Sequence, residues 1–311
     1  MPCRTKLALL AIVMASSAAW AVPAPAVAAR AHDSRLLLDV TRAGPHWVAV
    51  GEWGAVRISA DAGRHWSDVA SPTEETLTAV QFVDATRGVA VGHHGTVIVT
   101  LDGGQSWTRR NPDASSKEPL LGVYFENPEH GFVVGTFGAL LESQDGARTF
   151  RPRDIGQGDH HLKAIVGTPA GGVYIASEEG GVYCSADHGR TFRTTTTGYR
   201  GSFWGVSVVD QAVLVYGMRG TIYRSDDACR SWVAVPSGTT AGLITAAVPA
   251  PGRVVLAGAD GALLESADGG RSFVVVPRSD RAGITAAAAV SANEVLLLGR
   301  AEPSIHRLVK P

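Results

Sequence analysis

The sequence contains little of several residue types that many catalytic or nucleic-acid-binding domains need. Of its 311 residues only three are cysteine and three are methionine, and aromatic residues make up 7%. The 28 basic residues nearly balance the 29 acidic ones, which gives no support for nucleic-acid binding, because that function needs a basic field. The sequence has no CxxC, HExxH, GxSxG or P-loop motif, so it indicates no common metal, redox or nucleotide chemistry.

Long hydrophobic runs are also absent, except near the N-terminus. Arg4 and Lys6 precede an apolar run over residues 7–20, and small residues then lead to Ala26-Val27-Ala28. A short basic region, an apolar run and an A-x-A motif are typical of a secretory signal peptide. An uncleaved anchor is the alternative, but the apolar run is short for a membrane span.

We therefore expect residues 1–28 to be a signal peptide, with Ala19-Trp20-Ala21 as a second candidate cleavage motif. We then expect the mature protein to be exported to the periplasm or to the medium. We expect it to lie next to a membrane without spanning one.

Glycine is abundant, with 36 residues, and many of these glycines recur at a fixed spacing. A G-x-x-G string and then an S/T-x-D-x-G-x-S/T-W/F string, each with at most one departure per unit, occur in six successive units. The units begin at Gly51, Gly92, Gly135, Ser177, Gly217 and Gly258, and a degenerate seventh begins at Gly299. These starting positions are 40–43 residues apart, and such a period of short strands indicates the blades of a β-propeller.

The repeat predicts that residues 30–311 form one β-propeller domain, an all-β, seven-bladed propeller of four-stranded antiparallel blades. In the second unit we expect strands over residues 77–83, 88–91 and 96–100 and a fourth from Trp107. The seventh unit has three candidate strands, over residues 284–290, 294–298 and 305–309. Its outer strand either comes from residues just before Leu36 or is absent.

One aspartate recurs at the same position of each unit. Ser, Thr and Asp side chains can bond backbone groups of a turn, and glycine supplies positive φ angles, so we interpret these aspartates as structural residues and not as acids or metal ligands. They are Asp61, Asp102, Asp145, Asp187, Asp227 and Asp268.

The turn pattern resembles the Asp-box (BNR) repeat, and the longer unit resembles the photosystem II stability/assembly factor family. The best-matching segments are residues 92–107 and 258–273. This resemblance implies a seven-bladed lumenal or periplasmic propeller that assists membrane-protein assembly, with an arginine-rich patch for client contact. Arg200 in Gly198-Tyr199-Arg200-Gly201 and Arg219 in Gly217-Met218-Arg219-Gly220 are the best local matches to such a patch.

Sialidases also contain Asp-boxes, so a carbohydrate-active or sugar-binding propeller is the main alternative. The chain lacks the F/Y-R-I-P segment of sialidases, and no tyrosine can be paired with an acid or base from the sequence. We therefore expect no catalytic residue, no metal site and no cofactor. A structural module of a larger envelope complex is a third possibility.

Propeller topology places the loops between second and third strands, together with the blade-to-blade connections, on one face. These loops differ between units, and loops on a rigid scaffold often carry function. We expect this face to bind a protein client, one that is itself a membrane or exported protein, and we expect a monomer. The candidate contact residues are Trp53, His93, His94, Phe137, Tyr199, Arg200, Arg219 and Arg300.

Two cysteines remain after signal cleavage, Cys184 and Cys229. An exported protein could pair them, but they lie in neighbouring repeats and nothing in the sequence brings them within bonding distance. We expect two separate thiols.

Overall fold

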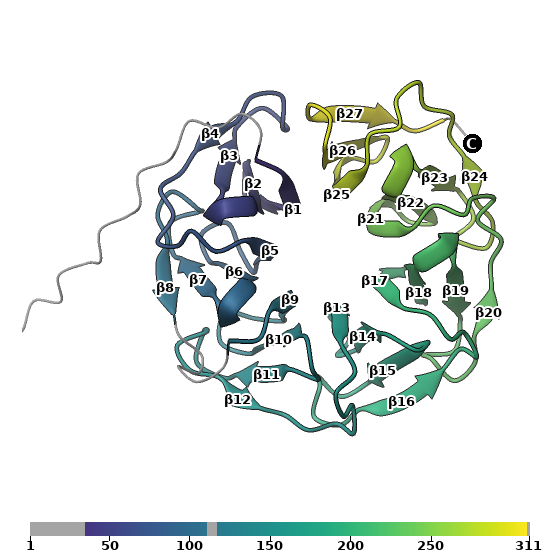
Figure 1. Ribbon diagram of the computed structural model, residues 1–311, viewed down its shortest axis with the longest axis horizontal. Helices are drawn as coiled ribbons and strands as arrows, with labels where there is room; N and C mark the ends of the chain where they lie inside the picture. Colours follow the sequence, from purple (N-terminus) through teal and green to yellow (C-terminus); the bar gives the residue numbers. More distant parts are fainter. Residues whose placement is uncertain (1–34, 111–116, 310–311) are drawn as a thin grey trace, which may run out of the picture.

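Seven antiparallel sheets follow one another around a central opening, as the computed structural model shows for residues 35–110 and 117–309 (Figure 1). This arrangement confirms the all-β, seven-bladed propeller. The expected signal peptide lies outside the described residues. Within them, no helix is long and apolar enough to cross a membrane.

Each sheet is one blade, and its first strand lies nearest the central opening (Figure 1). The strands of the first four blades are β1 (Leu37–Ala43), β2 (His46–Gly51), β3 (Val56–Ser59) and β4 (Ser67–Asp68); β5 (Leu77–Phe82), β6 (Gly88–Gly92), β7 (Val97–Thr100) and β8 (Thr108–Arg110); β9 (Leu120–Phe125), β10 (Gly131–Gly135), β11 (Leu140–Ser143) and β12 (Arg151–Pro152); and β13 (Leu162–Gly167), β14 (Val173–Ser177), β15 (Gly181–Ser185) and β16 (Arg193–Thr196).

The remaining blades follow the same order. Their strands are β17 (Phe203–Val209), β18 (Ala212–Gly217), β19 (Ile222–Ser225) and β20 (Val233–Ala234); β21 (Leu243–Ala250), β22 (Arg253–Gly258), β23 (Leu263–Ser266) and β24 (Val274–Val275); and β25 (Ile284–Ser291), β26 (Glu294–Gly299) and β27 (Ser304–Arg307).

The strands expected in the second unit agree with β5 to β8 to within about one residue at each end. The seventh blade has three strands among the described residues. Of the residues before Leu36 only Arg35 is described, and its guanidinium pairs with Asp68 of blade 1 at 3.1 Å. The expectation that earlier residues supply a fourth strand falls on residues outside the described part of the chain.

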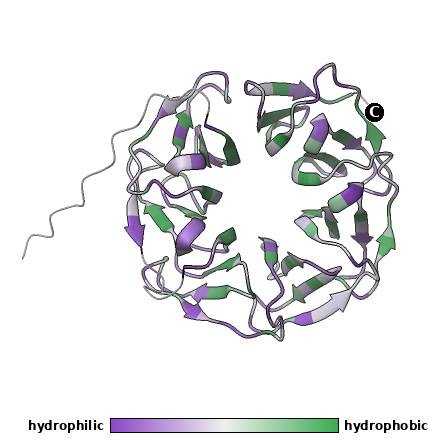
Figure 2. Cartoon of the chain, viewed as in Figure 1, coloured by the Kyte–Doolittle hydropathy of each residue, from purple (hydrophilic) through white to green (hydrophobic). Residues whose placement is uncertain are grey.

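The core lies between neighbouring blades. The second strand of most blades is buried along its whole length, and hydrophobic residues concentrate in the strands (Figure 2). The ring closes because Leu37 and Trp47 of blade 1 pack with Leu296 and Leu298 of blade 7. The hydroxyl of Thr285 also donates a hydrogen bond to the Leu37 carbonyl at 2.5 Å across the same junction.

The repeated aspartate closes the turn between third and fourth strands through a shared set of hydrogen bonds. In blade 2 the Thr100 hydroxyl donates to Asp102 Oδ1 at 2.7 Å and accepts the Gly104 N–H at 3.0 Å. Asp102 Oδ1 also accepts the Ser106 N–H, and Oδ2 accepts the Ser106 hydroxyl. Corresponding bonds occur at the other five aspartates.

We expect Thr100→Val to lower the free energy of unfolding by about 1–3 kcal/mol, because the buried Gly104 N–H loses its acceptor while the side-chain volume is kept. Thr100 is almost fully buried. Urea denaturation checks this, with the exposed Thr108 of the same blade, changed to Val, as the matched control. Equal stability of both variants would contradict a structural role for the turn.

The expectation of two separate thiols was wrong, because Cys184 and Cys229 form a disulfide between blades 4 and 5 with a Cα–Cα distance of 6.5 Å. The reason lies in the packing of the turns. Cys229 occupies the position in its turn that Gly104 and Gly189 occupy in theirs. A Cβ added to Gly104 or Gly189 would press against Val48 or Phe132, on the second strand of the preceding blade. The corresponding strand of blade 4 is β14, and its Tyr174 pairs with Cys184.

Candidate partner-binding face

In six of the seven blades, the loops between second and third strands share one backbone feature. Four of them are short 3-10 turns, namely η1 (Glu52–Gly54), η2 (His93–Gly95), η3 (Met218–Gly220) and η4 (Ala259–Gly261). In six blades the residue before the final glycine has a left-handed φ of 51–56° although it is not glycine. These residues are Trp53, His94, Phe137, Glu179, Arg219 and Asp260.

This conformation is unfavourable for residues with a Cβ, by about 1–2 kcal/mol each. The glycine that follows is required for a different reason: a Cβ on Gly54 would lie 2.0 Å from the Thr73 carbonyl oxygen. The side chain before it is exposed in all six turns, and its identity changes from blade to blade. The turns therefore keep varied, outward-facing side chains at positions where glycine would strain the backbone less.

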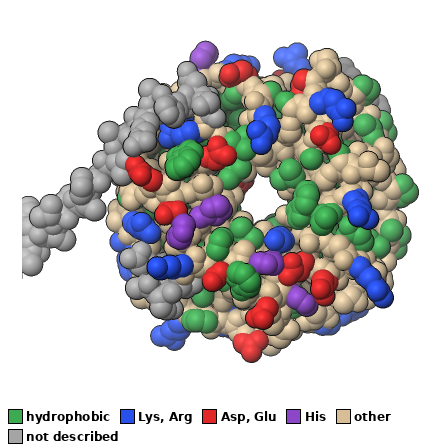
Figure 3. Space-filling view, in the orientation of Figure 1, with side chains coloured by type: hydrophobic (Ala, Val, Ile, Leu, Met, Phe, Trp, Pro, Cys, Tyr) green, Lys and Arg blue, Asp and Glu red, His purple; other side chains and the backbone are tan. Residues whose placement is uncertain are grey.

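The blade-to-blade connections pack directly against these turns. Gly138 N–H donates to the His160 carbonyl, and Gly180 N–H donates to the Gly201 carbonyl. Turns and connections thus form one surface, which we call the loop face; it is the face toward the viewer in Figure 3, where charged and hydrophobic side chains are intermixed. The repeated aspartates lie at the opposite ends of the strands.

Most of the predicted contact residues are exposed on the loop face. Trp53 and Phe137 are 72% and 61% exposed, which is high for large apolar side chains. Phe137 also contacts the ring of His161, at a centroid distance of 4.9 Å. The others that are exposed are His93, His94, Arg200, Arg219 and Arg300.

Two more of the predicted residues have local partners. His94 Nδ1 lies 2.7 Å from Glu75 Oε2, so the connection from blade 1 to blade 2 holds the His94 side chain in place. Tyr199 differs from the expectation of a contact residue. Its half-buried ring packs against Phe203 and Tyr223, and its hydroxyl donates to the Met218 carbonyl. Tyr199 therefore fixes the connection that presents Arg200.

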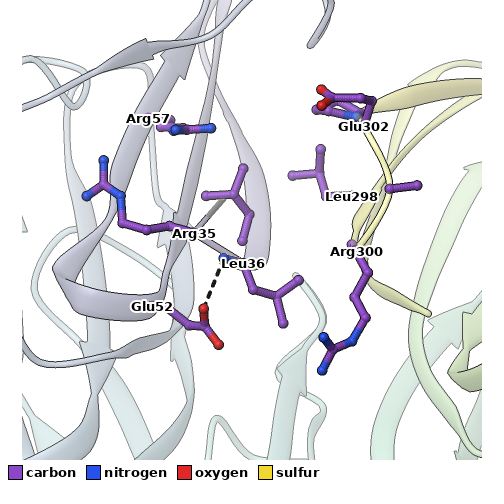
Figure 4. A pocket seen from close by; sticks show the side chains of 11 residues that line it. Arg35, Leu36, Glu52, Arg57, Leu298, Arg300 and Glu302 are labelled. Atoms are coloured by element: carbon purple, nitrogen blue, oxygen red, sulfur yellow. Dashed lines mark hydrogen bonds between the residues drawn. The ribbon is translucent and has the colours of Figure 1, made fainter. Parts of the chain in front are cut away.

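Arg300 borders a cavity of about 200 Å³ where blades 7 and 1 meet. Figure 4 shows Arg300 and Glu52 on opposite sides of this space, with Glu52 Oε2 accepting the Leu36 N–H at 3.1 Å. Arg35 and Arg57 also line it, but both lie against Asp68. Arg300 is therefore separated from Arg200 and Arg219, which belong to blades 4 and 5.

The repeated aspartates are poorly suited to acid–base chemistry. The Thr191 and Ser231 hydroxyls, together with the backbone N–H groups of the same turns, hold the pKa values of Asp187 and Asp227 well below the usual range. Each of these carboxylates accepts several hydrogen bonds from groups of its own turn. Among the described residues, no group of three or more His, Cys, Asp and Glu side chains is arranged to hold a metal ion.

Comparison with known families matches a model of the photosynthesis system II assembly factor YCF48 to residues 58–120 and 113–255. The two matches together extend over residues 58–255, which is more than half of the 311-residue chain. The chain belongs to the YCF48 family. No curated protein sequence matches it significantly.

Solved structures of YCF48 share the fold. A structure titled "YCF48 bound to D1 peptide" matches with a TM-score of 0.73 at 18% identity, covering 94% of this chain and 100% of that one. YCF48 from Cyanidioschyzon merolae matches with a TM-score of 0.71 at 15% identity, covering 88% and 95%. The GH74 enzyme of Niastella koreensis matches at 0.69 and 13% identity, covering 88% of this chain and 52% of that one. At these identities the likeness shows the fold alone.

Proposed function

We propose that this YCF48-family propeller is an exported, non-enzymatic assembly or stability factor that binds a segment of a protein client on its loop face. The observation that carries the proposal is the set of varied, exposed side chains held in left-handed turns, with Trp53, Phe137 and Arg219 among them. Aromatic and arginine side chains are enriched in interaction hot spots. A relative in the same family was solved with a bound peptide, which is consistent with this use of the fold.

Export is supported by two independent features. The N-terminal sequence resembles a signal peptide, and the Cys184–Cys229 disulfide is of a kind that persists in oxidising compartments such as the periplasm. We propose a periplasmic location, or a lumenal one in a photosynthetic host, with the client a membrane or exported protein. The absence of enzyme activity is supported by the hydrogen-bonded state of the aspartates described above.

The left-handed turns allow a test that separates binding from folding. Arg219→Gly removes the side chain while relieving the backbone, so we expect unchanged or slightly higher stability. Combined with Arg200→Glu, it should reduce recovery of the client by about tenfold, because a buried or bidentate arginine contact contributes at least this much to affinity. The measurement is chemical cross-linking in intact cells of the host followed by affinity purification and mass spectrometry.

Arg230→Glu is the matched control, since Arg230 is exposed in the Asp-box turn of blade 5, on the opposite face. Wild type and this control should recover the same client in similar amounts. Recovery of no specific protein by wild type, or equal recovery by the loop-face variant, would contradict the proposed function. Turnover of aryl glycosides by the purified protein would favour the carbohydrate-active alternative instead.

A further inference from the structure

All seven innermost strands contain a β-bulge at the same position. In each blade the pairing with the second strand skips the residue after the first paired one; in β1, for example, Leu37 and Asp39 are paired and Leu38 is skipped. A bulge leaves the extra residue outside the ladder and redirects its side chain. The skipped residues are Leu38, Thr78, Leu121, Lys163, Trp204, Ile244 and Thr285.

These residues form a ring at the inner edge of the loop face, which we call the inner rim. Their position follows from the register, because Leu37 pairs with Gly51, the residue that opens the turn of blade 1. The innermost strands surround the central opening, and hydrophobic side chains lie around that opening in Figure 3. The inner rim therefore lies between the exposed turn residues and the opening.

Three of the skipped side chains contact the next blade. The Thr78 hydroxyl donates to the Leu120 carbonyl of blade 3 at 2.7 Å, and Thr285 makes the equivalent bond to Leu37 of blade 1. The Trp204 ring lies over Gly242 of blade 6, where an added Cβ would be 2.3 Å from the ring. A residue at this position can therefore reach the junction between two blades, and a threonine there donates a hydrogen bond from one blade to the next.

Threonine occupies the position in blades 2 and 7, on either side of Leu38 in blade 1, whereas the four successive blades 3 to 6 have Leu121, Lys163, Trp204 and Ile244. We call these four the rim arc. All four are only half-buried, although three of them are large and apolar. Among the described residues the Lys163 side chain makes no hydrogen bond or ion pair, and in the order of the blades Lys163 lies between Leu121 and Trp204.

We infer that the rim arc binds a hydrophobic side chain of the client peptide and that Lys163 pairs with an acidic residue beside it. This inference rests on the proposed function and specifies its partner. An apolar surface containing one unpaired cation is complementary to a hydrophobic residue next to a carboxylate. Arg200 and Arg219 lie in the connection and the turn nearest Trp204 and add positive charge. Glu179 and Asp260, in the flanking turns, disfavour a run of several acidic residues.

The test uses a phage-displayed library of random peptides about 12 residues long, selected on the purified, oxidised protein. We expect selected peptides to carry an aromatic or aliphatic residue within one or two positions of Asp or Glu. A selected peptide is then synthesised with its acidic residue as Glu or as Gln, and both forms are titrated by isothermal calorimetry. Wild type should bind the Glu form about tenfold more tightly than the Gln form.

Lys163→Met keeps an unbranched apolar stem of similar length, so the hydrophobic contact should remain while the preference for Glu falls to about twofold or less. Lys163→Arg should retain most of that preference, and Arg230→Met, on the opposite face, should behave as wild type. A preference for Glu that survives Lys163→Met overturns the inference. So do selected peptides that lack acidic residues.

Two outcomes separate failure of the proposed function from failure of the inference alone. If no peptide is selected by wild type, both it and the inference are wrong for linear client segments. If peptides bind, and Arg200→Glu with Arg219→Gly abolishes binding while Lys163→Met leaves the Glu preference unchanged, only the inference is wrong.

Discussion

Removal of the Cys184–Cys229 disulfide is expected to lower the free energy of unfolding by up to about 4 kcal/mol. The bridge joins residues 45 apart in the sequence, and closing a loop of this length in the unfolded chain has an entropic effect of this size in the chain-entropy model. Both cysteines are buried between blades 4 and 5, in one hydrophobic cluster with Tyr174 and Phe203, so the native contacts around the bridge should largely persist.

Urea denaturation of the Cys184→Ala/Cys229→Ala double variant, compared with oxidised wild type, measures this effect. Unfolding of wild type in the presence of dithiothreitol should give a midpoint close to that of the double variant, and dithiothreitol should not affect the variant itself. Coincident unfolding curves for oxidised and reduced wild type, with the redox state verified by mass spectrometry, would show that the bridge contributes nothing to stability.

A second large effect is expected from Asp39, whose contribution to stability should decrease as the pH rises from about 4 to about 7. Burial raises the pKa of this carboxyl from 3.8 to about 6, although it accepts hydrogen bonds from the N–H groups of Val40 and of Val80 in the next blade. A group whose pKa is higher in the folded protein binds its proton more tightly there, so folding is favoured at low pH and loses this advantage once the carboxyl ionises.

The size of the effect follows from the shift of about two pH units, at 1.36 kcal/mol per unit, which gives at most about 3 kcal/mol. Asp39 is on the innermost strand of blade 1 and the residue is only half-buried, so water should reduce the penalty, and we expect about 1–3 kcal/mol. Asp187 and Asp227 act in the opposite direction, because their pKa values are lowered by hydrogen bonds, but they act below about pH 4.

Asp39→Asn isolates this contribution, because all other titrating groups are common to both proteins. The difference in free energy of unfolding between the variant and wild type, measured by urea denaturation at several pH values, should change in favour of the variant by about 1–3 kcal/mol between pH 4 and pH 7. A difference that stays constant over this range would mean that Asp39 titrates normally and that its burial has little electrostatic effect.

The number and boundaries of the blades could be predicted from the sequence because each unit repeats the same turn chemistry. The Ser or Thr, the Asp and the glycine of the turn make bonds within a few residues of one another, as in Thr100, Asp102 and Gly104, so their spacing alone defines the turn. The strands between turns then have little freedom in length. For this reason the second blade agrees with expectation almost residue by residue.

The disulfide, the left-handed turn residues and the bulges could not be predicted in this way. Each depends on how one blade packs against the next, and residues such as Arg219 or Trp204 carry no local signal of an unusual backbone conformation. Glycine usually marks such positions, but here another residue takes the position in every case. For the candidate site, the sequence predicted which face varies; it did not predict that Tyr199 is packed inward or that Lys163 is left unpaired.

The junction between the first and last blades has a consequence for how the chain acquires its structure. Thr285 and Leu37 are 248 residues apart, and the apolar side of blade 1 is covered by Leu296 and Leu298. Contacts this distant in sequence form slowly, because a long loop must close before they contribute any stability. During synthesis, the apolar side of blade 1 therefore stays uncovered until almost the whole chain has emerged, and this is the period in which the protein is most prone to aggregation.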